Sequence, residues 1–173
     1  MSGRLLRAFR DIMFERGYNR LTVRELIVRA GIARSTFYEY FDDKSDVLRL
    51  SVQPFLAVLA TCAVADRPSA TIASVLEHFQ RNRNLALAMG KGEARELMMT
   101  FLAEEIERCF NETARTADAR AELPTSLVAY QIAGAQLALI DAWLRKPQPP
   151  SATAIAAALF QTSHAMATAL LHA

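Results

Sequence analysis

Apolar residues recur every three or four positions along almost the whole chain, and no alternating apolar and polar run bounded by turn residues interrupts them. This spacing places apolar side chains along one face of an α-helix, so the sequence predicts an all-α protein. The first stripe runs from Leu5 to Met13 and is followed by Gly17, a residue type that commonly ends a helix. A helix is therefore expected over residues 2–16.

Two short helices are predicted next. Thr22 and Glu25 have the spacing of a capping box, in which each side chain bonds the backbone N–H of the other residue. A third helix is expected within residues 33–40, because Asp43 then caps a further helix that opens at Lys44. Three short helices in this part of the chain make a compact module.

Longer helices follow this module. The first is predicted from Lys44 toward Ala65, with a kink or break near Gln53, because Pro54 has no backbone N–H to donate. A polar connection is expected at residues 115–122. The other apolar stripes bring the total to about nine helices, and place the last five around residues 72–79, 85–89, 97–110, 124–145 and from 151 onward.

Composition limits the class of protein. The chain has 173 residues, of which 52% are hydrophobic and 22% charged, so disorder is excluded as the main state. Cys62 and Cys109 are too few and too far apart for a disulfide framework, and reduced core cysteines in a cytoplasmic protein are expected. Charges near the N-terminus argue against an export signal, and prolines in the uncharged stretch 147–173 argue against a membrane span.

Basic charge is concentrated at one end of the chain. Residues 1–50 contain ten Lys and Arg against seven Asp and Glu, a balance of +3. The other 123 residues contain ten against eleven, a balance of −1. This asymmetry is a weak pointer to a polyanionic partner.

Residues 22–44 have the form of a helix-turn-helix, with a capped helix, a turn at Gly31 and a short second helix. An α-helix fits the major groove of DNA, and the preceding helix can brace it against the backbone. Phe37 and Phe41 are four residues apart and are expected to face the core of the module. Hydroxyl-bearing side chains that can bond bases or phosphates are then left on the outside: Ser35, Thr36, Tyr38 and Tyr40.

The run from Ala30 to Leu48 resembles the helix-turn-helix signature of the tetracycline-repressor (TetR) family of bacterial transcriptional regulators. The residues that carry this resemblance are Ala30, Gly31, Thr36, Phe37, Tyr38, Tyr40, Phe41 and Lys44. It covers about residues 4–50, and beyond them only the layout of helices is similar. The resemblance implies a DNA-binding domain over residues 1–47 and an effector-binding and dimerisation domain over residues 48–173.

The resemblance also implies roles for single residues. Thr22 and Lys44 would meet DNA phosphates at the N-termini of two helices, where backbone N–H groups already favour an anion. Tyr38 would reach the DNA backbone or bases. The residues nearest the base edges would be Arg34, Ser35 and Thr36.

Two positions depart from the family pattern. Ala33 stands where the family often has a Ser or Thr, so the third helix is expected to start without a side-chain cap. Tyr40 stands where the family often has His. Its hydroxyl can still bond a phosphate, but it adds no charge that titrates near neutral pH.

The larger domain is expected to bind a small effector. Bulky side chains on its inward stripes are the candidate pocket walls, with plain core packing as the alternative: Phe55, Phe79, Met98, Phe101, Tyr130 and Trp143. Residues 123–140 carry no charge, and only three charged residues lie between Gln53 and Phe79. The sequence therefore favours an apolar or aromatic effector.

The last two helices are expected to form a homodimer interface. The uncharged run 123–140 and the nine alanines of residues 151–173 provide more apolar surface than one small domain needs. A two-fold four-helix interface would bury it, while the alternative is that both helices fill the core of one chain. The candidate interface residues are Ile155, Leu159, Met166 and Leu170.

Catalysis is not expected, because the sequence shows no nucleophile and base in a recognised motif. His78 has no partner at metal-ligand spacing, so neither a metal nor a cofactor is predicted. The sequence predicts a cytoplasmic, ligand-responsive repressor that binds pseudo-palindromic operator DNA as a homodimer and is released by a small molecule. The alternative is a helical protein-interaction module that does not bind DNA.

Overall fold

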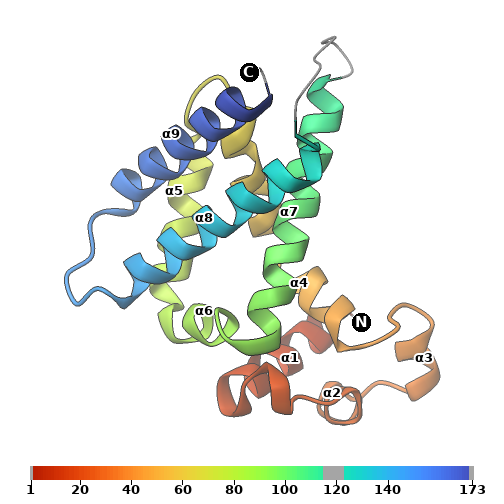
Figure 1. Ribbon diagram of the computed structural model, residues 1–173. Helices are drawn as coiled ribbons and strands as arrows, with labels where there is room; N and C mark the ends of the chain where they lie inside the picture. Colours follow the sequence, from red (N-terminus) through yellow and green to blue (C-terminus); the bar gives the residue numbers. More distant parts are fainter. Residues whose placement is uncertain (1, 115–122, 172–173) are drawn as a thin grey trace. The chain divides into compact units, whose positions relative to one another are not determined.

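The computed structural model describes residues 2–114 and 123–171, and every regular element in these ranges is helical (Figure 1). The predicted all-α class with nine α-helices is confirmed for this part of the chain, and the predicted connection at residues 115–122 lies outside it. The α-helices are α1 Ser2–Arg16, α2 Val23–Ala30, α3 Arg34–Tyr38, α4 Lys44–Ala60, α5 Ala70–Arg81, α6 Arg83–Met89, α7 Gly92–Ala114, α8 Thr125–Arg145 and α9 Ala152–Leu171. Two 3₁₀ turns are added by η1 Tyr18–Arg20 and η2 Thr61–Ala63.

The predicted ends of α2 are confirmed. The Glu25 backbone N–H donates to Thr22 Oγ1 at 3.2 Å, and the Thr22 backbone N–H donates to the Glu25 carboxylate at 3.3 Å. At the other end Gly31 has φ 61° and ψ 45°, the left-handed conformation that glycine adopts without strain. Local signals in the sequence thus fix where this helix begins and ends.

The predicted break of α4 at Pro54 is wrong, whereas a kink there stays a prediction. The helix continues through Pro54 to Ala60, and η2 follows it, so it also ends earlier than Ala65. Proline removes one backbone hydrogen bond from a helix interior, which disfavours the helix. Val52 and Leu56, on either side of Pro54, are buried, and the packing of such side chains offsets that loss.

The chain forms two compact units. Unit 1 comprises Met1–Pro54 and Asn82–Met98, and unit 2 comprises Phe55–Arg81 and Met99–Ala173. The division falls inside α4 and inside α7, so α6 and the first two turns of α7 belong to the unit that contains the helix-turn-helix.

Unit 1 is built around α1. This helix packs against α2 and α6, and its apolar stripe is buried as predicted, with Phe9, Ile12 and Met13 each at most 2% exposed. Phe37 of α3 and Leu48 of α4 are also fully buried. Burial of these side chains stabilises short helices that have little stability of their own.

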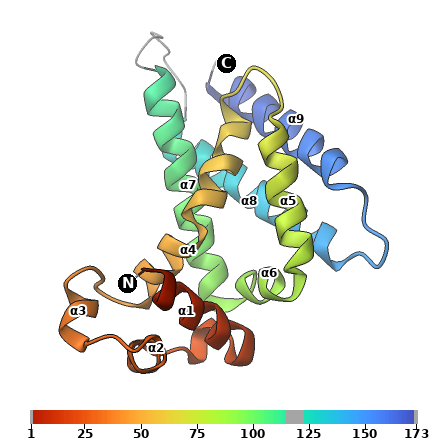
Figure 2. The same cartoon turned by 180° about the vertical axis from the view of Figure 1, so that it is seen from behind.

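Unit 2 is a helical bundle in which α9 packs against α8, α5 and η2 (Figure 2). Among the residues of this unit that the structure describes, the core is apolar except for one buried polar pair, Gln136 and Ser163. Gln136 Nε2 donates to the Leu59 carbonyl at 3.2 Å and to Ser163 Oγ at 2.9 Å. These bonds join α8 to α4 and α9. They also stabilise the core, because a buried donor without a partner costs free energy.

The two cysteines lie in the core, as predicted. Cys62 and Cys109 are free and buried, and burial raises the pKa of the Cys62 thiol to about 11. Thiols in such surroundings are protonated at neutral pH and react slowly.

Two helical stretches, Lys44–Ala63 and Thr125–Arg145, are long and apolar enough to cross a membrane by length and composition alone. In their most apolar parts 44% and 50% of the residues are buried inside the protein. Core helices of soluble proteins have the same properties, so these stretches do not indicate a membrane protein.

Candidate nucleic-acid interface

Helix α3 is held in place by Phe37. Its side chain is fully buried, and its ring meets the rings of Tyr38 at 5.3 Å and Phe41 at 5.4 Å between centroids. Phe37 therefore faces the core as predicted, while Phe41 is half-buried. Because α3 has only five residues, aromatic packing rather than helix propensity fixes its position.

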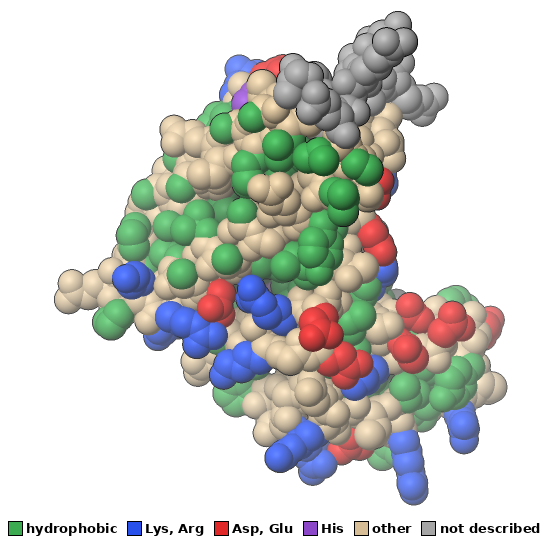
Figure 3. Space-filling model, in the orientation of Figure 1, with side chains coloured by type: hydrophobic (Ala, Val, Ile, Leu, Met, Phe, Trp, Pro, Cys, Tyr) green, Lys and Arg blue, Asp and Glu red, His purple; other side chains and the backbone are tan. Residues whose placement is uncertain are grey.

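The opposite side of α3 is open. Ser35 and Arg34 are exposed, Tyr38 and Tyr40 are 47% and 61% exposed, and Thr36 is partly covered. Arg34 and Tyr38 form a pair, with the guanidinium carbon 5.5 Å from the ring centroid. This cation–π contact restricts both side chains on the free surface. Figure 3 shows further Lys and Arg side chains projecting from unit 1.

Helix α3 starts without a side-chain cap, as expected from Ala33. The N-cap Ala33 has extended backbone, φ −72° and ψ 149°, and makes no capping bond among the described residues. A Ser or Thr here would satisfy one free backbone N–H of the first turn. Such N–H groups remain available to a phosphate or to water.

Thr22 caps α2 rather than standing free for DNA. Its hydroxyl accepts from the Glu25 backbone and donates to the Glu25 carboxylate at 3.1 Å, and Arg16 donates to the same carboxylate at 2.8 Å. A phosphate contact from this hydroxyl would require it to leave Glu25. The backbone N–H groups of the first turn remain the simpler donors.

Thr22→Ala is expected to lower the free energy of unfolding by about 1 kcal/mol, because the capping bond to Glu25 is lost. Chemical denaturation monitored by circular dichroism measures this loss. Thr22→Ser keeps the hydroxyl and is the control. Equal destabilisation by both substitutions would contradict a capping role.

Lys44 lies differently from what the sequence suggests. Its side chain is only 20% exposed, and its ammonium group donates to the Glu93 carboxylate at 3.1 Å and to the Tyr18 carbonyl at 3.3 Å. It also lies 4.2 Å from the centroid of the Tyr18 ring. The family resemblance did not indicate this pairing, because Glu93 is 49 residues away along the chain.

The predicted pocket residues differ in their burial and contacts. Phe101 and Trp143 are buried, and the Trp143 indole donates to the Pro150 carbonyl at 2.9 Å. Phe55 and Phe79 come together, with centroids 5.6 Å apart, and His78, which was not predicted here, stacks on Phe55 at 4.8 Å. Met98 is half-buried and falls in unit 1.

The expectation that Tyr130 faces inward is wrong, because this side chain is 54% exposed. The buried face of α8 is formed by Val128, Ala129, Ile132, Ala133 and Gln136. Residues on the opposite side of the helix, including Tyr130, therefore face outward. Most positions of α8 are apolar, and one of its polar residues, Gln136, is buried, so the sequence pattern did not separate the two faces.

The predicted interface residues of α9 are also placed differently. Ile155 is 7% exposed and Leu159 is fully buried, so these two fill the core of unit 2, as the alternative held. Met166 and Leu170 are half-buried. The outward faces carry other residues: Leu127, Tyr130, Gln131, Ala135, Ala138 and Ala142 in α8, and Ala154, Gln161, Ala165 and Ala169 in α9. Figure 3 shows hydrophobic side chains gathered over both helices.

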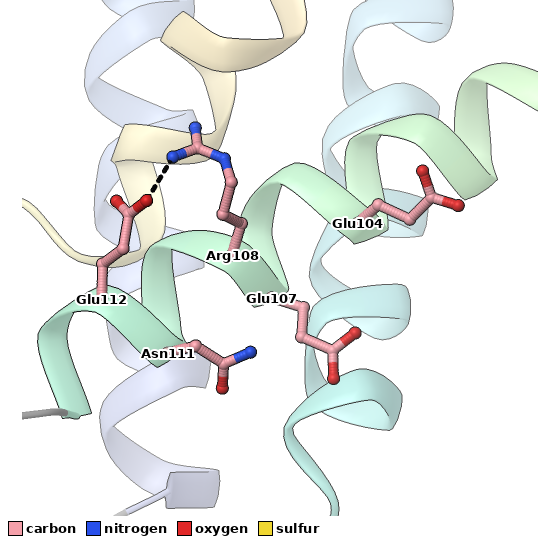
Figure 4. A pocket seen from close by; sticks show the side chains of 5 residues that line it. All are labelled: Glu104, Glu107, Arg108, Asn111 and Glu112. Atoms are coloured by element: carbon pink, nitrogen blue, oxygen red, sulfur yellow. Dashed lines mark hydrogen bonds and ion pairs between the residues drawn. The ribbon is translucent and has the colours of Figure 1, made fainter.

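One surface hollow of unit 2 lies along α7 and has a volume of about 340 Å³ (Figure 4). Charged and polar side chains line it: Glu104, Glu107, Arg108, Asn111 and Glu112. Arg108 bonds Glu112 at 2.6 Å and Glu105 at 2.8 Å, so its charge is compensated. None of the predicted pocket residues lines this hollow.

The N-terminal part of the chain matches a known protein family. Residues 5–50 match the sequence profile of the bacterial regulatory proteins of the tetR family. No curated protein matches the chain at a significant level.

Solved structures with the same fold share little sequence identity with this chain. A TetR transcriptional regulator from Streptococcus agalactiae is similar with a TM-score of 0.58 and 16% identity, over 94% of this chain and 92% of that one. The fatty acid degradation regulator FadR from Bacillus halodurans has a TM-score of 0.56 and 18% identity, over 95% and 98%. SmeT, the repressor of a multidrug efflux pump of Stenotrophomonas maltophilia, has a TM-score of 0.54 and 18% identity, over 99% and 90%.

A helix-turn-helix is a motif that places its second helix in the major groove of DNA. The helix-turn-helix of this chain is that of the tetR family of bacterial regulatory proteins, and its fold is that of TetR-family regulators. The resemblance carried by residues 30–48 is thereby confirmed.

Proposed function

We propose that the protein is a ligand-responsive transcriptional repressor that binds a pseudo-palindromic operator as a homodimer. The observation that carries this proposal is α3, whose exposed polar side chains lie over a buried aromatic anchor in a tetR-type helix-turn-helix. In such a module the second helix enters the major groove. The DNA-binding domain of the proposal is residues 1–47, and residues 48–173 bind the effector and the second copy.

Roles on the DNA follow from exposure and position. Arg34, Ser35 and Thr36 form the first turn of α3. Ser35 and Thr36 are proposed to meet base edges, and Arg34 is proposed to contact a phosphate, with base contact as the alternative. Tyr38 and Tyr40 are the exposed aromatic residues proposed to bond phosphates or bases. Thr22 and Lys44 are proposed to support phosphate contacts at the first turns of α2 and α4.

The homodimer is proposed to form through the outward faces of α8 and α9. Six exposed residues of these helices are alanines, and the two larger apolar side chains among the exposed residues, Leu127 and Tyr130, are 59% and 54% exposed. The other exposed residues are polar or charged, and they include Gln131 of α8 and Gln161 and His164 of α9. Small residues allow two helices to approach closely, and four such helices make a two-fold bundle. Two copies of α3 would then face successive major grooves.

The effector is proposed to be a small apolar or aromatic molecule. The core of unit 2 offers one buried polar pair, Gln136 and Ser163, among apolar side chains. A ligand within such a core would find few counter-charges. A FadR repressor of Thermus thermophilus, similar in fold with a TM-score of 0.52 and 15% identity, was solved with lauroyl-CoA. As a regulator of the chromosome, the protein is proposed to act in the cytoplasm and to have no membrane partner.

Selection of binding sites from random duplex DNA tests this function. Recovered sites are expected to be pseudo-palindromes with half-sites about one helical turn apart, or a multiple of it, and binding should weaken steeply with salt. If the folded protein binds no duplex DNA even at low salt, the repressor proposal is wrong. The protein-interaction module would then be the better reading of the fold.

Thr36→Ala is expected to cost on the order of 1 kcal/mol on the selected operator and little on random DNA, if Thr36 meets a base edge. Titration of both duplexes, followed by fluorescence anisotropy, measures the difference. Tyr38→Phe and Tyr40→Phe keep the rings and report the hydroxyl groups separately. Undiminished operator binding by a folded Thr36→Ala, Tyr38→Ala double variant would contradict the assignment of α3 as the reading helix.

A further inference from the structure

The ammonium group of Lys44 has an anionic partner within unit 1. Nζ lies 3.1 Å from Glu93 Oε2 and 3.3 Å from the Tyr18 carbonyl oxygen, with the Tyr18 ring 4.2 Å away. The Lys44 side chain is 20% exposed, whereas that of Glu93 is 49% exposed. The pair therefore lies at the surface, with the cation on the inner side.

The backbone before Glu93 brings the start of α7 close to η1. Gly92, the first residue of α7, has φ 53°, and a Cβ added there would lie 3.2 Å from both terminal atoms of the Asn19 side chain. A glycine thus lets α7 begin directly against η1. Burial raises the pKa of the Tyr18 phenol, and the negative charge of Glu93 raises it further. Glu93 is therefore close enough to act electrostatically on Tyr18.

We propose that Glu93 competes with DNA phosphate for Lys44 and so lowers the DNA affinity of the protein. The inference rests on the proposed DNA-binding function. Lys44 is the first residue of α4, where backbone N–H groups and a lysine together favour an anion. The Lys44 ammonium already donates to the Glu93 carboxylate and to the Tyr18 carbonyl, so Glu93 compensates its charge and one of its three N–H donors is left. Glu93 does not contact DNA in this proposal, and it acts by holding the Lys44 ammonium group.

Glu93 lies on a helix that belongs to both units of the chain. It stands in the first turn of α7, and α7 continues from unit 1 into Met99–Ala114 of unit 2. A displacement of that first turn would change the distance to Lys44 without any change in α3. The number of phosphates that the protein neutralises would then depend on α7.

Glu93→Gln tests the proposal, because the amide keeps the shape of the carboxylate and removes its charge. Binding to a 30-base-pair duplex of arbitrary sequence is measured at several salt concentrations. The variant is expected to bind about tenfold more tightly at 0.1 M salt, and the slope of log K against log salt to steepen by about 0.9 for each phosphate gained by a subunit. In a Lys44→Gln background the same change should have no effect on the slope.

Glu77→Gln is the matched control, since it removes the same charge from an exposed position of α5. A second readout is the Nζ signal of Lys44, which is one of three lysines in the sequence, with Lys91 and Lys146. In nitrogen-15 spectra this signal should be protected from solvent exchange in the parent protein and broadened in Glu93→Gln.

The outcomes separate the two proposals. If the parent protein binds the duplex and folded Glu93→Gln binds equally or less tightly, the competition is refuted while DNA binding stands. An unchanged Lys44 signal in Glu93→Gln refutes it as well. If the parent protein does not bind the duplex at any salt concentration, the proposed function itself is refuted.

Discussion

Phe37→Ala is expected to unfold the helix-turn-helix and abolish DNA binding. Replacing a fully buried phenylalanine by alanine costs about 3–5 kcal/mol, which is a large part of the 5–15 kcal/mol that stabilises a typical domain. The loss of stability should affect α3 most, because this helix has only five residues and no side-chain cap among the described residues, and so depends on the packing of Phe37. Binding would fail on every DNA sequence, since the fold and not the reading surface is lost.

Thermal unfolding followed by circular dichroism measures this effect, and binding to operator and random duplexes is measured in parallel. Phe14→Ala is the matched control, because Phe14 of α1 is 67% exposed and its removal should change stability little. A Phe37→Ala protein that melts as the parent does, but prefers a different operator, would show that Phe37 reads DNA directly.

The helix-turn-helix was predictable because its signals are local. The capping box at Thr22, the left-handed Gly31 and the spacing of Phe37 and Phe41 each act within a few residues. Such signals mark helix ends within a few residues of sequence, without reference to distant parts of the chain. The same locality explains why the bounds of α1, α2 and α8 agree closely with expectation.

The use of Lys44 was not predictable from its neighbours in the sequence. Its partner Glu93 is 49 residues away, and that distance is closed only when α7 begins beside η1. Nothing in the spacing of Glu93 distinguishes it from other exposed glutamates of α7. A motif can therefore indicate that a lysine is suited to an anion without indicating which anion it meets.

The faces of α8 and α9 escaped prediction for a different reason. Helical periodicity identifies the buried face only when the other face is polar. In α9 both the buried Ile155 and the exposed Ala165 are apolar, and in α8 the exposed Tyr130 is bulkier than its buried neighbours. Gln136 is a polar residue on the buried face, where its Nε2 donates to the Leu59 carbonyl and to Ser163 Oγ, so polarity alone does not mark the exposed face of this helix.

Ala138→Arg is expected to convert the proposed homodimer into a monomer. Ala138 lies on the exposed face of α8, four residues from the exposed Ala142 and seven from Gln131. If two copies of this face pack closely, an arginine there must be accommodated together with its symmetry mate. A buried unpaired charge costs several kcal/mol, and two like charges near a two-fold axis repel each other. Sedimentation equilibrium at micromolar protein should give the dimer mass for the parent chain and the monomer mass for the variant.

Operator binding should fall together with the dimer. Two linked reading heads gain about 10²–10⁴ in affinity over one, so Ala138→Arg should weaken operator binding by at least about a hundredfold while circular dichroism stays unchanged. Ala70→Arg introduces the same charge at the exposed start of α5 and should leave both the mass and the binding intact. A dimer that persists in Ala138→Arg would exclude this part of α8 from the interface. A parent protein that is monomeric at micromolar concentration would exclude the homodimer, since both α8 and α9 would then keep their apolar faces in water.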